Sequence, residues 1–201
     1  HVGMVFQFPE HQLFDETILK DVMFGPLNMG LSQEEAKERA EKYLSLLGVP
    51  LDQIGRSPFD LSGGQMRKIA IAGILAMEPE VLIVDEPTAG LDPKSHIETM
   101  KLFKEIQQEF NITIILVTHD MNDVFEYTDE VKLLGSGKLI KEGRTLDILT
   151  DEKLLTDHYL EIPDIVRLAH DVSKKGVALN RMPRNTDEFI TLYKKWRDER
   201  A

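Results

Sequence analysis

Two adjacent carboxylates follow a short apolar run and are the strongest single candidate for chemistry in the chain. The run, residues 81–84, reads VLIV, and Asp85 and Glu86 follow it directly. Such a run is typical of a buried parallel strand, and open α/β sheets bind ligands at the carboxyl ends of their strands. On an extended strand the two side chains would face different directions. One could hold Mg²⁺ while the other orients a water molecule, as phosphoryl transfer requires. An acidic surface turn after a core strand is the alternative, and the pair alone does not decide.

A pair of glycines at an expected helix start is the second candidate. Residues 61–65 read LSGGQ, so Ser62 can cap a helix that begins with Gly63 and Gly64. Bare backbone amides at the positive end of a helix dipole can approach an anion closely. An ordinary serine cap is the alternative, but each glycine in a helix costs about 1 kcal/mol relative to alanine. The pair therefore indicates a phosphate-binding site.

The segments around these residues predict alternating strands and helices. Three buried strands, each ending in polar residues, are expected at 2–6, 81–84 and 112–117. Three helices with recognisable caps are expected at 33–47, 62–77 and 92–109. A hairpin is expected at 131–141, and the pattern beyond 145 is helical. Strands and helices alternating at this spacing predict an α/β fold with a parallel sheet.

Composition narrows the function classes. A chain of 201 residues with 42% apolar side chains can build one or two compact domains. The net charge of −11 opposes sequence-independent binding to nucleic acid. The absence of cysteine excludes disulfides, thiolate metal sites and cysteine nucleophiles. No apolar stretch is long enough to span a membrane, and the first residues have no basic region typical of a secretory signal.

Five motifs, in this order, resemble those of the ATP-binding-cassette (ABC) ATPases. They are Gln7 for the Q-loop, residues 61–65 for the signature motif, 81–86 for Walker B, 89–92 (AGLD) for the D-loop and His119 for the switch histidine. The match covers about residues 2–145. It implies a P-loop NTPase-like parallel sheet core with a helical signature-motif subdomain.

The resemblance also implies a division of the chain. Residues 1–150 would form a partial ABC ATPase domain, with its helical subdomain at about 12–78. Residues 151–201 would be a helical C-terminal extension. That extension would serve in dimerisation or regulation, or simply stabilise the fold.

The resemblance assigns a role to each candidate residue, with ATP and Mg²⁺ as the bound groups. Glu86 would be the general base, and His119 would contact the γ-phosphate. Asp85 would bind Mg²⁺, and Gln7 would touch both Mg²⁺ and the attacking water. The nucleotide of a partner subunit would be bound by Ser62, Gly63, Gly64 and Gln65. Asp92 would help to fix the two subunits together.

Residues 8–14 (FPEHQLF) and 70–79 (AIAGILAMEP) look most like the ATPase subunits of energy-coupling factor (ECF) transporters. This likeness implies a subunit that powers uptake of a vitamin or a transition-metal ion from the cytoplasmic face of the membrane, where it is bound peripherally. Its partners would be an identical or homologous ATPase subunit in a head-to-tail dimer, an integral membrane subunit at the Q-loop region and, indirectly, a substrate-binding membrane subunit. No nucleic-acid partner is expected.

The sequence departs from the family pattern at the phosphate loop. No G-x-x-x-x-G-K-[ST] motif occurs, and the glycine-plus-lysine clusters at 135–138 and 174–176 have the wrong spacing. In the family this loop lies upstream of the Q-loop, so the 201 residues are expected to be the C-terminal part of a longer subunit. Alone they would be inactive and bind ATP·Mg²⁺ weakly, because the backbone cradle and the lysine are missing.

Other readings of the same motifs are the ATPase of another ABC importer and, less favoured, a DNA-repair or chromosome-type ABC ATPase. The latter class carries long coiled-coil or zinc-bearing insertions between Q-loop and signature motif, and here that stretch is short and has neither heptads nor cysteine. Residues 12–30 mix apolar and acidic side chains. They are expected either to receive a basic helix from a membrane subunit or to pack the helical subdomain.

Overall fold

The computed structural model describes residues 1–200. The chain falls into two compact units, one over His1–Val117 and one from Thr118 onward. The boundary expected at about residue 150 divides the chain by family resemblance rather than by compactness, and it stays a prediction.

The first unit contains a three-stranded parallel sheet in the order β1-β2-β3. The strands are β1 (Val2–Val5), β2 (Val81–Asp85) and β3 (Thr113–Val117). Val84 of β2 is paired with Val5 on one side and with Leu116 on the other. The predicted parallel α/β sheet is therefore confirmed, with the Walker B-like strand in its centre.

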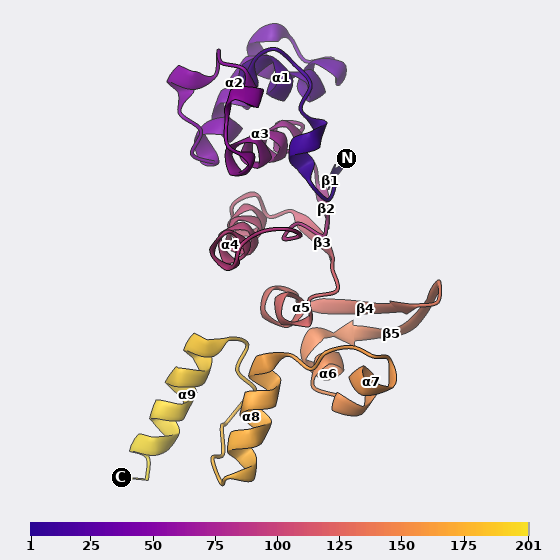
Figure 1. Cartoon of the computed structure of the whole chain (residues 1–201), viewed down its shortest axis with the longest axis vertical. Helices are drawn as coiled ribbons and strands as arrows, with labels where there is room; N and C mark the ends of the chain where they lie inside the picture. The colour runs from indigo at the N-terminus through magenta and orange to yellow at the C-terminus, as the bar shows by residue number, and fades with distance from the viewer. Residues whose placement is uncertain (201) are drawn as a thin grey trace. The chain divides into compact units, whose positions relative to one another are not determined.

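Helices α1 to α3 pack against one another, and α4 packs against β3, as Figure 1 shows. Their bounds are α1 (Ile18–Asn28), α2 (Gln33–Leu46), α3 (Gly63–Leu75) and α4 (Pro93–Phe110). Three short 3₁₀ turns complete the unit, η1 (Pro9–Gln12), η2 (Leu51–Gln53) and η3 (Pro58–Asp60). Helices α2, α3 and α4 begin at their predicted caps, which are Ser32, Ser62 and Asp92.

Helix α1, over residues 18–28, was not predicted from the sequence. The Gly25-Pro26 pair is a typical helix breaker, and Pro26 removes one hydrogen bond from the helix ladder, yet it lies inside α1, where Ile18, Val22 and Met23 are buried in the core. Thr17 caps the start, its hydroxyl accepting from the Lys20 amide at 3.3 Å.

Helix α3 is the centre of the first unit. Most of its length is buried, as expected for a helix that is apolar on several faces. It contacts α1, α2, β1 and η1. The close approach to β1 depends on Gly3, because a Cβ at that position would lie 2.9 Å from Ile74 Cγ2 and 3.1 Å from Pro79 Cγ.

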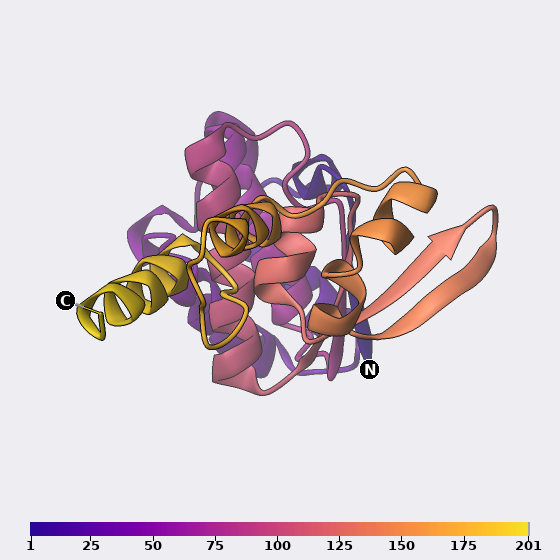
Figure 2. The ribbon, with the colours of Figure 1, turned by 90° about the horizontal axis from the view of Figure 1, so that it is seen from below.

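The second unit is built from one hairpin and short helices (Figure 2). They are α5 (Met121–Tyr127), β4 (Glu130–Gly135), β5 (Lys138–Arg144), α6 (Thr145–Leu149), α7 (Glu152–Asp157), α8 (Asp164–Lys174) and α9 (Thr186–Asp198). Its core centres on Phe125, Ile148, Leu149, Leu155 and Val166. The hairpin and the helical region beyond 145 were predicted; α5 was not.

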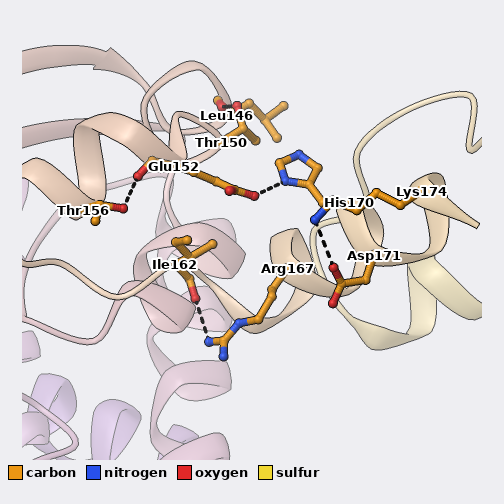
Figure 3. A network of polar contacts seen from close by, with 9 residues as sticks. All are labelled: Leu146, Thr150, Glu152, Thr156, Ile162, Arg167, His170, Asp171 and Lys174. Carbon is orange, nitrogen blue, oxygen red and sulfur yellow. Dashed lines mark hydrogen bonds and ion pairs between the residues drawn. The ribbon is translucent and has the colours of Figure 1, made fainter.

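Polar contacts join α8 to the segments before it (Figure 3). His170 contacts Glu152 of α7, and Arg167 donates to the Ile162 carbonyl at 3.3 Å. Such exposed contacts each contribute little to stability. Arg184, in the segment before α9, donates to the Thr128 carbonyl at 2.6 Å. Because the exposed polar contacts add little, burial of the apolar core contributes most of the stability of this unit.

Among the described residues, none of the helices has the length and apolar character needed to cross a membrane.

We expect Gly3→Ala to lower the free energy of unfolding by about 1–3 kcal/mol, because the new methyl group overpacks the contact between β1 and α3. Gly55→Ala is the matched control, since a Cβ there meets nothing within 4 Å, and its effect should stay within about 0.5 kcal/mol. Urea unfolding followed by circular dichroism measures both. Equal midpoints for the two variants would contradict the close approach.

Candidate functional site

The carboxyl ends of β1 and β2 bring three predicted residues to one edge of the sheet. Val5 of β1 is paired with Val84 of β2. The backbone continues from β1 to Gln7, and from β2 to Asp85 and Glu86. Gln7 is exposed, whereas the two carboxylates are half-buried. The segments that carry one amide and two carboxylates therefore leave the sheet at neighbouring strand ends.

The backbone at Glu86 turns sharply. Strand β2 ends at Asp85, and Glu86 adopts a left-handed conformation with φ 45°. Its amide donates to the Val117 carbonyl at 2.9 Å. Glu86 therefore lies outside the strand, so the alternation of an extended strand does not set the direction of its side chain, and the expectation that the two side chains face different directions stays a prediction. A left-handed glutamate is strained and persists only where its surroundings hold it.

Two overlapping turns lead from Glu86 to α4. The Ala89 amide donates to the Glu86 carbonyl at 3.2 Å, and Gly90 has φ 73°. Asp92 then caps α4, its Oδ1 accepting from the Lys94 amide at 3.0 Å and its Oδ2 from the Ser95 hydroxyl at 2.6 Å. The Ser95 hydroxyl, followed by backbone amides, lowers the pKa of the Asp92 carboxyl. Asp92 is thus a charged cap that sets the direction of α4.

The start of α3 forms a second cluster in the same unit. Ser62 and Gln65 make a capping box, in which the Gln65 amide donates to Ser62 Oγ at 3.4 Å and the Ser62 amide donates to Gln65 Oε1 at 3.2 Å. The amides of Gly63 and Gly64 are in the first turn and have no acceptor inside the helix. A Cβ at either glycine meets nothing within 4 Å. An anion can therefore reach both amides.

His119 belongs to the second unit, whereas the other predicted residues belong to the first. It lies between the end of β3 and the start of α5, and its side chain is exposed. The turn around it is defined on both sides. The Asp120 amide donates to Thr118 Oγ1 at 3.1 Å, and Asp120 Oδ1 accepts from the Asn122 amide at 2.8 Å as the cap of α5.

One ion pair in the first unit, between Arg67 and Glu10, was not predicted from the sequence. Arg67 of α3 is buried and donates through Nε and Nη2 to Glu10 at 3.1 and 3.3 Å. Its Nη1 donates to the Pro87 carbonyl at 3.2 Å. The signal in the sequence is an arginine next to a long apolar helical run, since a buried arginine nearly always has a partner.

A groove of about 360 Å³ lies over α1 and α3. It is lined by Gln12, Leu13, Phe14, Asp21, Phe24, Gly25, Asn28, Met29, Ala70, Gly73, Ile74 and Met77. Phe14 and Phe24 are exposed and meet edge to face, with ring centroids 4.7 Å apart. Ile18 and Val22, by contrast, are fully buried in the core. Residues 12–30 therefore do two things, packing the helical subdomain and leaving aromatic side chains open in a groove.

Comparison with known proteins defines the class. Residues 1–89 match the family described as ABC transporter. Among solved structures, cbiO1 from Clostridium perfringens, part of the ABC transporter complex cbiONQ, is 40% identical with a TM-score of 0.67, covering 84% of this chain and 67% of that one. A dimeric ATP-binding cassette in a post-hydrolysis state, bound to ADP and Pi, is 31% identical with a TM-score of 0.58, covering 72% of this chain and 62% of that one. The chain belongs to the ATP-binding proteins of ABC transporters.

Curated relatives narrow this to one group. The energy-coupling factor transporter ATP-binding protein EcfA2 of Staphylococcus saprophyticus is 46% identical over 98% of this chain and 69% of its own length. EcfA2 of Lactiplantibacillus plantarum is 48% identical over 94% of this chain and 64% of its own length. The chain thus spans about two thirds of the length of these relatives. The predicted fold and the predicted likeness to ECF ATPases are confirmed.

We expect Gly63→Asp to fold with at least the stability of the original chain. Its Cβ enters open space, and an acidic residue in the first turn of a helix is favourable. Ser62→Ala should instead lose about 1 kcal/mol, because it removes the cap. Urea unfolding measures both variants. A Gly63→Asp variant less stable than Ser62→Ala would contradict the open geometry at this helix start.

Proposed function

We propose that this chain belongs to the ATPase subunit of an ECF-type transporter, and that the whole subunit hydrolyses ATP to power uptake of a vitamin or transition-metal ion. The proposal is carried by one observation: the neighbouring ends of β1 and β2 lead into Gln7, Asp85 and Glu86, in a chain whose relatives are named ECF transporter ATP-binding proteins. Those relatives favour transport over the DNA-repair alternative.

The residues at the sheet edge fit a magnesium ion. Amide and carboxylate oxygens are hard ligands of the kind that Mg²⁺ prefers, and Gln7 and Asp85 present them at neighbouring strand ends. When bound, Mg²⁺ would neutralise phosphate charge. Asp85 and Gln7 would hold the ion, and Gln7 would also contact the attacking water.

Glu86 is the proposed general base. It follows the end of β2 in a left-handed turn, and from there its carboxylate would orient a water molecule and accept its proton. His119 would contact the γ-phosphate. Because the two residues come from separate strand ends, each can be aimed by its own turn.

The start of α3 is the proposed binding site for the γ-phosphate of a nucleotide held by a second ATPase subunit. The amides of Gly63 and Gly64 supply the donors, while Ser62 and Gln65 shape the turn through their capping box. In this head-to-tail dimer, Asp92 would act at the subunit interface by fixing the turn that leads into α4.

The groove over α1 and α3 is the proposed contact with an integral membrane subunit. Phe14 and Phe24 offer exposed aromatic surface, and Asp15, Glu16 and Asp21 add acidic side chains beside it. An amphipathic basic helix fits this combination. Through that subunit the chain would be held at the cytoplasmic face of the membrane and coupled indirectly to a substrate-binding membrane subunit.

In the full-length protein within its transporter complex, Glu86→Gln should reduce ATP turnover by about 10²- to 10⁴-fold, because a general base contributes that much. Nucleotide binding should be retained. Single-turnover hydrolysis and binding of a labelled nucleotide measure the two quantities. Hydrolysis at the original rate would remove Glu86 from the proposed role.

The Gly63→Asp variant tests the proposed phosphate site at the start of α3 in the same hydrolysis assay. It should fold, yet lose ATP hydrolysis, because its carboxylate repels the phosphate at the start of α3. Gly55→Ala should hydrolyse ATP normally. Full activity in Gly63→Asp would show that no phosphate binds there.

Phe24→Ala should weaken binding of the full-length protein to the purified membrane subunit by about tenfold, as expected for an aromatic anchor. Leu51→Ala is the control, because Leu51 is similarly exposed (45% against 49%) and does not line the groove. Binding can be measured with the membrane subunit in lipid nanodiscs. Equal affinities of the two variants would argue against the groove as the contact.

A further inference from the structure

The ion pair between buried Arg67 and half-buried Glu10 connects three segments that the proposed function uses. Glu10 lies in η1, three residues after Gln7, and Arg67 lies in the first half of α3, three residues after Gly64. The carbonyl that accepts the third contact belongs to Pro87, directly after Glu86. A single guanidinium therefore joins the Q-loop, the signature helix and the Walker B turn.

A second contact joins two of the same loops. Phe8, next to Gln7, has a left-handed backbone with φ 58°. Its ring lies against Gly90, so that a Cβ on that glycine would be 3.4 Å from Phe8 Cε1. The Q-loop is thus held on one side by the Gly90 turn and on the other by Arg67.

The Arg67–Glu10 ion pair is better suited to holding neighbouring residues in position than to stabilising the fold. A buried ion pair is weak evidence for stability, because apolar residues of the same volume often serve as well. The planar guanidinium has donors in a fixed fork, so it can hold a carboxylate and a carbonyl at set angles. With both partners in place, Arg67 therefore ties the turn that carries Glu10 to the turn that carries Pro87.

The turn η1, which carries Glu10, also borders the groove, as does α3, which carries Arg67. Gln12, the last residue of η1, lines the groove together with Leu13, and α3 contributes Ala70 and Gly73. Displacement of η1 or α3 by a partner in the groove would move Glu10 against Arg67. The Pro87 carbonyl, and with it the turn that carries Glu86, would then follow.

We propose that Arg67 and Glu10 are positioning residues that transmit the state of the groove to Gln7 and Glu86. This inference rests on the proposed function, since it assumes that the sheet edge hydrolyses ATP. It assigns to the pair the coupling between partner binding and hydrolysis, and it requires no contact between Arg67 and the nucleotide.

The test uses the full-length protein in its transporter complex in proteoliposomes. Arg67→Met should lower kcat by about 10- to 100-fold, as a displacement of about 1 Å in catalytic groups can. KM for ATP should change less than about threefold, because no nucleotide contact is lost. Substrate taken up per ATP hydrolysed should also fall. Arg67→Lys should recover part of kcat, because the ammonium group of lysine can pair with Glu10 but cannot also hold the Pro87 carbonyl at a fixed angle as the guanidinium does. Glu10→Gln should resemble Arg67→Lys and covers the case in which Arg67→Met does not fold.

Arg39→Met is the matched control, because Arg39 pairs with Glu78 at 3.1 Å in the same unit without joining these loops. It should keep kcat and coupling unchanged. The proposal is overturned if folded Arg67 and Glu10 variants keep the original kcat and uptake per ATP, if only KM changes, or if Arg39→Met loses activity equally. Failure of the underlying function would show differently, as an absence of ATP hydrolysis in the unsubstituted complex.

Discussion

Burial of helix α3 is the constraint on which the rest of the first unit depends. The helix contacts β1, η1, α1 and α2, and most of its side chains are removed from water. A charged side chain in such a helix must find its partners within the protein, because an unpaired buried charge costs several kcal/mol. Arg67 finds them in Glu10 and in the Pro87 carbonyl. The need to satisfy one charge thereby fixes the loops at the edge of the sheet.

That edge stores backbone strain in two places. Phe8 and Glu86 both have positive φ angles without being glycine, and each such residue costs on the order of 1–3 kcal/mol. Glu86 is held by the bond from its amide to Val117, and Phe8 by packing beside Gly90. The parallel register brings the strand ends together, and these local contacts then fix the backbone from which the candidate side chains extend. The backbone positions of Phe8 and Glu86 are therefore held by contacts with neighbouring segments of the first unit.

Local rules accounted for much of this fold in advance. Ser32, Ser62 and Asp92 mark helix starts correctly because capping depends on residues within one turn of each other. The same local reasoning missed α1, where the Gly25-Pro26 pair resembles a stop signal although tertiary packing keeps the helix intact. It also missed the partner of Arg67, which is 57 residues away in the chain. Parallel pairing of the strands that precede Gln7 and Glu86 was predictable from the sequence. The left-handed turn at Glu86 was not, since the Glu86 amide is bonded to another strand.

The two capping boxes in the first unit differ in one chemical group. Helix α2 closes its box with Glu35, whose pKa is lowered by the Ser32 hydroxyl, and it carries a second acid, Glu34, in its first turn. Helix α3 closes the same box with Gln65 and has no acidic residue in its first turn. Glutamine keeps the hydrogen-bond geometry of the cap but adds no negative charge. The partial positive charge at the start of α2 is therefore neutralised from within, while that of α3 is left for a ligand from outside.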